Sequence, residues 1–276
     1  ILFLHEPDSE FKIKNVPILV TSTRYSEYRE LICQYSTTLL KKCTIRINGK
    51  MPFFNKSYLP GLRYSFFKFN LITAKAIEKL DISIPIWNPF NNDTGNKKKL
   101  IAWKSIESCG RAGLIINAIP RCKIIYIIRH PCGQIASVIK GENAGNFSSK
   151  FETSEDYQLF ETLLLSDYAK SHHLTIKKIR EMEPIERLAI RWVLYNEQAI
   201  NDIENTENKG VIIRYEDLCK DPTKVAKKMY SFSGLNWNYQ VENFLNQSTE
   251  NQSDSYYSVF KNPAIAMSKW KQFLTD

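Results

Sequence analysis

The chain has 276 residues, 43% of them hydrophobic, and 38 Lys and Arg against 29 Asp and Glu, a formal net charge of +9. This length is enough for one or two domains with a sizeable core. The longest apolar runs are far too short to cross a bilayer, and the first residues lack the basic region and cleavage site of a secretion signal. We therefore expect neither a membrane span nor a secretion signal, which favours a cytoplasmic location.

The cysteines and the charges exclude two further classes of site. The six cysteines are scattered without a Cys-x-x-Cys pair or a zinc-like spacing. We expect buried free thiols, with disulfides as the alternative, and no metal site. The lysine pairs are dispersed among acidic residues, and no basic patch interleaved with aromatic residues indicates nucleic-acid binding. The net charge favours an anionic ligand, and a basic nucleic-acid-binding protein is a weaker alternative.

The hydrophobic periodicity predicts alternating strands and helices. Strands are predicted, in chain order, at residues 1–4, 100–103, 124–128 and 211–213. Helices are predicted at 27–40, at 111–119, from 131 onward, at 156–169, from 184 onward, at 222–232 and at 239–245. A polar, irregular region and a Pro/Asn-rich loop or insertion at 84–96 separate the first two strands. This order is typical of an α/β protein with a doubly wound parallel sheet, and the absence of a linker or repeat indicates a single domain over 1–276.

The segment 121–141 joins a strand to a helix through an arginine. The run Ile124–Ile128 is apolar and mostly β-branched, which predicts a strand covered on both faces. Arg129 ends the strand, Pro131 suits a first helical position, and Ser137 follows two turns later. Ligands of such sheets bind beyond the carboxyl ends of strands, where helix N-termini attract anions. We therefore expect an anion-binding site at Arg129.

Four motifs extend this interpretation. RHPCGQIAS follows one strand, RYEDLCKDP follows a later strand, and FSGLNW and SKW come after them. Together they resemble the sulfotransferases that use 3′-phosphoadenosine 5′-phosphosulfate (PAPS), from about Ile1 to Trp270. The motif spacing is closest to that of tyrosylprotein sulfotransferases and related carbohydrate sulfotransferases. The resemblance implies a P-loop-like, three-layer α/β/α fold with a central parallel sheet.

The resemblance also implies which residues bind the cofactor. By motif position, Arg129 and Ser137 hold the 3′-phosphate, because a guanidinium makes forked, charge-assisted bonds to phosphate and a hydroxyl adds a neutral donor. Tyr215 contacts the nucleotide, and Lys261 reaches the cofactor phosphates. One further serine near the bridging oxygen has three candidates: Ser248, Ser253 and Ser258.

Two catalytic roles are implied in the same way. Lys104 lies where the family has a lysine that stabilises charge on the transferred sulfonate. Glu6 lies where the family has the base that takes a proton from the acceptor hydroxyl, with His5 as the neighbouring alternative. We expect Glu216 and Asp217 to be first-turn helix acids rather than catalysts.

The family's 5′-phosphosulfate loop is missing from the sequence. No Gly-rich turn with Lys or Arg and Ser or Thr opens a helix anywhere in the 276 residues. We expect the chain to be N-terminally incomplete, lacking the first strand and this loop, and to leave an unpaired strand edge.

The predicted function is transfer of a sulfonate from PAPS to a carbohydrate or tyrosine hydroxyl, with release of adenosine 3′,5′-bisphosphate and no metal. The alternatives are a non-catalytic sulfotransferase-like fragment and another P-loop phosphotransferase. Two aromatic residues, Trp192 and Trp270, are predicted to lie in the core.

Overall fold

A computed structural model describes residues 2–39, 41–50, 53, 61–82, 84–88, 100–147, 151–250 and 262–274. Its strands form two parallel pairs. β1 (Leu2–His5) pairs with β2 (Ile101–Lys104), and β3 (Ile124–Ile128) pairs with β4 (Gly210–Arg214). All four predicted strands are therefore present, and their parallel pairing confirms the α/β class.

The helices connect and cover these strands. The longer ones are α2 (Tyr25–Leu39), α4 (Gly61–Glu78), α6 (Pro131–Asn143), α10 (Pro184–Glu204), α12 (Pro222–Ser233) and α13 (Tyr239–Glu250). The shorter ones are α1 (Pro7–Glu10), α3 (Ile45–Asn48), α5 (Ala112–Ala118), α7 (Tyr157–Leu163), α8 (Asp167–Ser171), α9 (Ile176–Glu181), α11 (Tyr215–Lys220) and α14 (Pro263–Ser268). Turns of 3₁₀ helix cover Ser22–Arg24, Cys109–Arg111, Thr153–Glu155 and Lys269–Gln272. None of the described helices is both long and apolar enough to cross a membrane.

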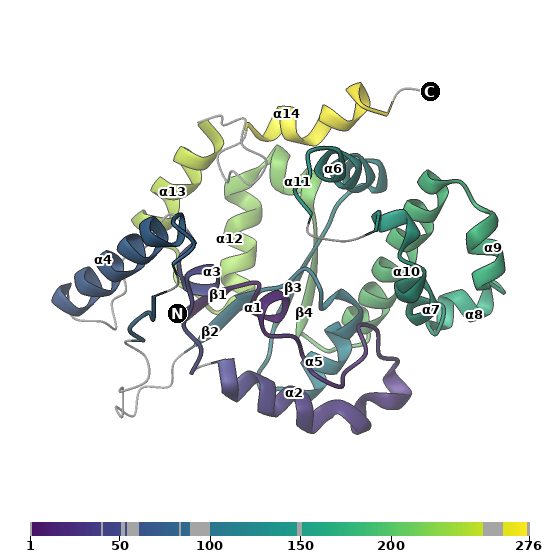
Figure 1. Cartoon of the computed structure of the whole chain (residues 1–276), viewed down its shortest axis with the longest axis horizontal. Coiled ribbons are helices and arrows are strands. Elements are labelled where there is room, and N and C mark those ends of the chain that lie inside the picture. The colour runs from purple at the N-terminus through teal and green to yellow at the C-terminus, as the bar shows by residue number, and fades with distance from the viewer. Residues whose placement is uncertain are drawn as a thin grey trace.

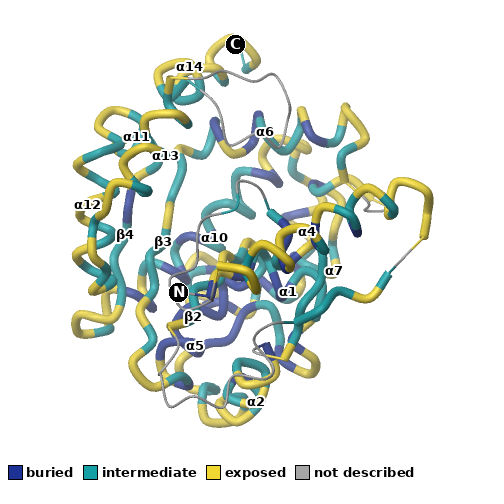
Figure 2. Tube along the Cα trace, turned by 90° about the vertical axis from the view of Figure 1, so that its left-hand side faces the viewer, coloured by how far each residue is buried: buried dark blue, intermediate teal, exposed yellow. Residues whose placement is uncertain are grey.

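Helices lie on both sides of the second strand pair. α10 packs against β3 and β4, and α12 lies on the other side of these strands in both Figure 1 and Figure 2. Figure 2 also shows that burial is most continuous along α5, where Leu114 is fully buried. Leu114 and Ile115 pack with Ile32 of α2, so α5 joins the strands to the outer helix layer.

The two strand pairs are separate two-stranded sheets. Within the described residues, β2 and β3 each have a hydrogen-bonded strand on one side only. The prediction that β3 is covered on both faces is wrong, because the Ile127 side chain is 47% exposed. An apolar, β-branched run therefore predicted the strand correctly but not its surroundings, which depend on elements far away in the chain.

Two helical regions differ from the sequence prediction. α4 spans residues expected to be irregular, and its Phe67, Leu71 and Ala74 pack inward. The expected helix at 156–169 is broken into α7 and α8, because the Ser166 hydroxyl caps α8 by accepting from the backbone N–H of Ala169. A hydroxyl that bonds the backbone locally starts a new helix more readily than it continues an old one.

The cysteines also differ in part from expectation. All six are free thiols, as predicted. They are partly exposed as residues rather than fully buried. Burial nevertheless raises the pKa of the Cys43 thiol to about 12 and that of Cys122 to about 11, so these thiols stay protonated at neutral pH.

Candidate active site

Glu6 and Lys104 meet where β1 and β2 end. The strand register puts His5 beside Lys104, and the Glu6 backbone N–H donates to the Lys104 carbonyl over 2.8 Å. Glu6 has a left-handed backbone (φ 47°) just before the Pro7 that opens α1, so the chain turns sharply there. The Lys104 ammonium donates to Glu6 Oε1 over 2.5 Å. Two residues 98 positions apart thus form one ion pair at the carboxyl end of the strands.

The surroundings keep Glu6 charged and His5 neutral. Burial raises the pKa of Glu6, but the hydrogen bond from Lys104 and the positive charges of Lys104 and Arg46 outweigh burial and leave that pKa below its ordinary value. Burial lowers the pKa of His5, and Lys104, Lys50 and Arg46 lower it further against the opposing charge of Glu6. His5 Nε2 is 3.9 Å from Glu6 Oε1. At neutral pH, Glu6 therefore offers a carboxylate that can accept a proton, and Lys104 offers an ammonium group that can donate hydrogen bonds.

Arg129 is held at the end of β3 by contacts from three directions. The Trp192 indole N–H donates to the Arg129 carbonyl over 3.0 Å, which anchors its backbone. Its guanidinium carbon lies 4.9 Å from the centre of the Tyr215 ring, and Nη2 donates to the Ala266 carbonyl over 3.3 Å. A Cβ atom on Gly133 would come within 2.9 Å of Arg129 Nε, so this glycine makes room for the side chain. Most of the guanidinium's five N–H donors remain for an anion.

Tyr215 follows β4, and the Arg129 guanidinium lies over its ring. Burial raises the pKa of Tyr215 to about 12, with a further rise from Cys219 and an opposing effect of Arg129. The phenol therefore stays neutral at physiological pH and offers an aromatic face to the guanidinium. The sequence prediction brought Arg129 and Tyr215 to one site, and the structure places them in contact.

A pocket of about 220 Å³ adjoins this arginine at the ends of β3 and β4. Its lining residues are His130, Arg214, Glu216, Lys220, Met267, Ser268, Trp270 and Lys271. The His130 and Trp270 rings stack, with centres 4.9 Å apart and planes at 8°, and the His130 backbone N–H donates to Glu216 Oε1 over 3.0 Å. Three basic side chains and a stacked ring pair suit a ligand with phosphate groups and a flat ring.

This pocket includes residues that the sequence prediction did not assign to a site. Trp270 was expected in the core but is partly exposed and lines the pocket, while Trp192 anchors the Arg129 backbone. Glu216 is a first-turn acid of α11, as expected, and also accepts the hydrogen bond from His130. Their motifs were a usable signal, because His130 is adjacent to Arg129 and Trp270 ends the SKW motif.

The remaining predicted cofactor residues have different outcomes. Ser137 lies on α6, four residues after Gly133 and therefore on the same helix face as the glycine that adjoins Arg129. Lys261 lies outside the described residues, as do Ser253 and Ser258. The Ser248 hydroxyl donates to the Leu245 carbonyl within α13.

The predicted residues form two groups. Glu6 and Lys104 are at the end of the first strand pair, and Arg129 and Tyr215 are at the end of the second. Within the described part of the chain, no hydrogen bond or ion pair joins one group to the other. No cluster of three or more His, Cys, Asp or Glu side chains there could hold a metal ion.

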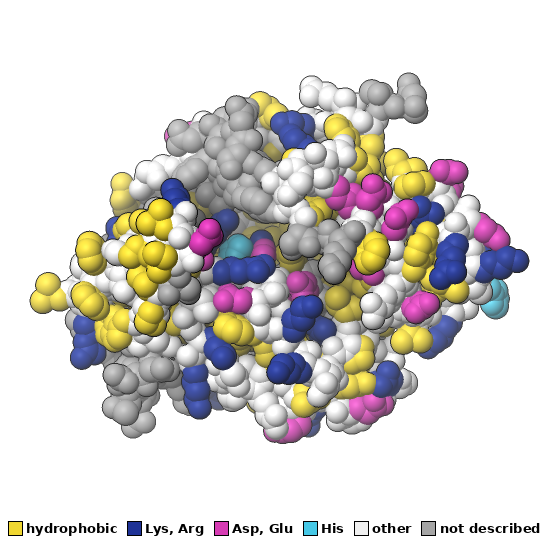
Figure 3. Space-filling model, in the orientation of Figure 1, with side chains coloured by type: hydrophobic (Ala, Val, Ile, Leu, Met, Phe, Trp, Pro, Cys, Tyr) yellow, Lys and Arg dark blue, Asp and Glu magenta, His cyan; other side chains and the backbone are white. Residues whose placement is uncertain are grey.

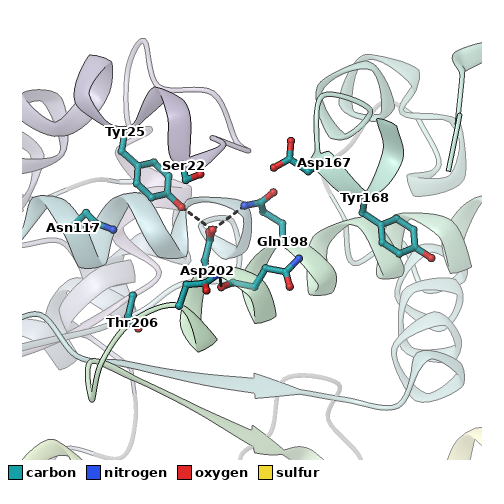
Figure 4. Close-up of a pocket in the computed structure, with 10 residues that line it drawn as sticks. Ser22, Tyr25, Asn117, Asp167, Tyr168, Gln198, Asp202 and Thr206 are labelled. Carbon is teal, nitrogen blue, oxygen red and sulfur yellow. Dashed lines mark hydrogen bonds between the residues drawn. The ribbon is translucent and has the colours of Figure 1, made fainter. Parts of the chain in front are cut away.

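A larger cavity of about 420 Å³ lies at the opposite, amino ends of β3 and β4 (Figure 4). Two of its lining residues, Asn117 and Thr206, precede these strands in the chain. Figure 4 shows the Asp202 carboxylate at its centre, accepting hydrogen bonds from Tyr25 and Gln198. Because ligands of parallel sheets bind at the carboxyl ends, the smaller basic pocket is the better candidate site.

Comparison with known proteins identifies the family. A model described as the sulfotransferase family matches residues 19–239, which is most of the chain. The chain belongs to the sulfotransferase family. The matched range of this sulfotransferase-family chain includes Lys104, Arg129, Ser137 and Tyr215, whereas Glu6 and Lys261 fall outside it.

The individual proteins similar to this chain match it only over a short segment or at low sequence identity. Carbohydrate sulfotransferase 3 of Mus musculus is 36% identical, and that of Homo sapiens 33% identical, over 63 residues. Those residues are 22% of this chain and 13% of each relative, so the likeness spans a small part of their length. A solved structure described as a sulfotransferase domain from the curacin biosynthetic pathway has 18% identity and a TM-score of 0.37, covering 65% of this chain and 58% of that one.

Proposed function

We propose that this chain transfers a sulfonate group from PAPS to a hydroxyl group and releases adenosine 3′,5′-bisphosphate. The contact between Glu6 and Lys104 is the observation that carries the proposal, because it unites a proton acceptor and a cationic donor at the carboxyl ends of parallel strands. The named relatives favour a carbohydrate acceptor over a protein tyrosine.

The charge and donors around Arg129 fit the nucleotide half of this cofactor. Arg129 binds the 3′-phosphate through its remaining N–H donors, and Tyr215 keeps the guanidinium in position. Ser137 adds a hydroxyl donor from the same face of α6 as Gly133. Lys261 is proposed to reach the phosphates, by motif position alone. When bound, the cofactor supplies the activated sulfonate.

Glu6 and Lys104 perform the proton transfer and the charge stabilisation. Glu6 accepts the proton of the acceptor hydroxyl at a carboxylate oxygen, since its lowered pKa keeps it ionised. The Lys104 ammonium is half exposed and keeps N–H donors free for the negative charge that develops during transfer. His5, whose lowered pKa keeps it neutral, is the neighbouring alternative as base.

Binding and chemistry can be tested separately on the same protein. Adenosine 3′,5′-bisphosphate should raise the melting temperature of a complete protein much more than 5′-AMP does, because only the former has a 3′-phosphate for Arg129. Arg129→Gln should weaken the binding of adenosine 3′,5′-bisphosphate about tenfold to a hundredfold, because the charge-assisted hydrogen bonds to its 3′-phosphate are lost. Lys177→Gln, at an exposed position of α9, is the control and should bind normally. Equal shifts with both nucleotides would contradict the 3′-phosphate site.

Turnover is measured as release of adenosine 3′,5′-bisphosphate from PAPS with a panel of carbohydrates and a tyrosine peptide. Glu6→Gln should abolish this release and keep the nucleotide-induced shift in melting temperature. Retained turnover in Glu6→Gln would exclude Glu6 as the base. Nucleotide binding by the wild-type chain without turnover on any acceptor would instead support the non-catalytic alternative.

A further inference from the structure

The outer face of α4 carries a row of exposed apolar side chains. Leu62 is 88% exposed, Phe66 57%, Phe69 66% and Ile72 47%. Their spacing of four and three residues puts them on one face of the helix, which we name the α4 apolar face. Leu80 and Ile82, just beyond the helix end on either side of the exposed Asp81, are 70% and 53% exposed. A contiguous patch of this kind marks an interaction site more often than scattered exposed residues do.

The core fixes which way this face points. Phe67, Leu71 and Ala74 of α4 are buried, and Phe67 and Leu71 pack with Leu2 and Leu4 of β1. α4 therefore has two apolar stripes, and the inner one occupies the core. Figure 3 shows hydrophobic side chains gathered at the end of the molecule where Figure 1 places α4. The α4 apolar face is therefore held toward the outside.

Basic side chains flank the α4 apolar face. Lys68 lies next to Ile72 on the helix wheel and Lys79 directly follows the last helical residue, and both are exposed. Arg63, also exposed, lies beyond the other border, next to Phe66 on the helix wheel. Glu78, at the last position, is the only acidic residue of α4. Aromatic and aliphatic residues bordered by Lys and Arg are the composition of a helix that lies in a membrane interface.

The charges select an anionic partner. A second copy seated on this face would add the same basic residues to the contact, between two chains that each have a net charge of +9. An anionic phospholipid bilayer instead provides hydrocarbon for the phenylalanines and negative headgroups for the lysines. We propose that the α4 apolar face docks this protein peripherally on anionic lipid bilayers.

Vesicle co-sedimentation tests the proposal directly. The chain should bind phosphatidylcholine vesicles containing phosphatidylserine, bind pure phosphatidylcholine at least tenfold more weakly, and be released by salt. Leu62→Ser/Phe69→Ser should reduce binding to the anionic vesicles at least tenfold. Lys68→Gln/Lys79→Gln should reduce it severalfold. The matched control is Leu165→Ser/Ile185→Ser, which removes two apolar side chains of about half exposure elsewhere and should leave binding unchanged.

Several outcomes would overturn the proposal. If the wild-type chain does not bind anionic vesicles, lipid docking is excluded. It is also excluded if the control variant loses as much binding as Leu62→Ser/Phe69→Ser does. If light scattering shows a dimer that Leu62→Ser/Phe69→Ser converts to a monomer, the face is a contact between copies and the lipid proposal fails. Circular dichroism of each variant confirms that a loss of binding does not reflect unfolding. Nucleotide binding is measured on the same samples, so the outcome is independent of the proposed sulfonate transfer.

Discussion

At the scale of single residues, two neighbours at the end of β1 have opposite preferences for a proton. Glu6 is 14% exposed and paired with Lys104, so its pKa lies below the ordinary value of 4.5. His5 is partly buried next to three cations, so its pKa lies below 6.5. Both shifts favour the deprotonated side chain in the folded state. The folded chain therefore binds fewer protons than the unfolded chain as the pH falls.

This linkage predicts two steps in acid stability. From pH 6.5 downward the unfolded chain protonates His5 first, so the free energy of unfolding should fall, and His5→Gln should remove this step. From pH 4.5 downward the unfolded chain protonates Glu6 before the folded chain does, so the free energy of unfolding should fall again. Glu6→Gln should remove this second step. The Glu6 step should be at most about 1 kcal/mol, because Lys104 is half exposed and screened. Urea denaturation across pH 3 to 8 measures both, and unchanged steps in these variants would contradict the assignment.

At the scale of elements, one buried carboxylate ties three helices together. Asp202 of α10 accepts from the Tyr25 hydroxyl of α2 over 2.7 Å and from the Gly113 backbone N–H of α5 over 3.0 Å. Gln198 Nε2 of its own helix donates to it over 2.8 Å. Burial raises the pKa of Asp202 despite these three donors. α5 lies directly before β3, so the same contact supports the strand that ends at Arg129.

Removal of this carboxylate should loosen the three helices. Asp202→Ala leaves the buried N–H of Gly113 and the partly buried hydroxyl of Tyr25 without their partner, and the loss of the buried contact should cost about 1–3 kcal/mol of stability. Asn201→Ala changes an exposed neighbour on the same helix and should cost less than about 0.5 kcal/mol. Chemical denaturation compares the two variants. Equal stabilities would show that the three contacts contribute nothing net.

At the scale of the whole molecule, two parallel strand pairs stand where a continuous sheet was expected. β3 bonds to β4 through the Ile124 N–H, which donates to the Lys209 carbonyl. Backbone groups alternate in direction along a strand, so the Tyr126 and Ile128 amides also face β4, while those of Ile125 and Ile127 face the edge toward the first pair. In the part of the chain that the structure describes, no strand lies on that edge.

Hydrogen exchange should report this alternation. The amide of Tyr126 should exchange at least about tenfold more slowly than the amides of Ile125 and Ile127, because only the former is in the ladder with β4. Nuclear magnetic resonance resolves the three rates individually. Uniform protection along β3 would show that a further strand pairs with its outer edge in solution and would contradict the edge assignment.

Local patterns were sufficient to predict much of the fold and part of the site. The run Ile124–Ile128, with Arg129 after it and Pro131 opening a helix, predicted β3 and α6 because strand and helix periodicity are properties of neighbouring residues. α4 was not predicted, since apolar residues on both of its faces hide the amphipathic pattern. The stacking of His130 on Trp270 joins residues 140 positions apart, a distance that no local pattern spans.

The sequence by itself determined the strands, most of the longer helices, the family motifs and the residue types that suit an anionic cofactor. Only the tertiary structure decided that Lys104 pairs with Glu6, that Tyr215 and Gly133 position Arg129, and that Trp270 lines a pocket. The reason is physical: secondary structure follows from contacts between near neighbours in the chain, whereas charge pairing, burial and pKa depend on which distant elements pack together.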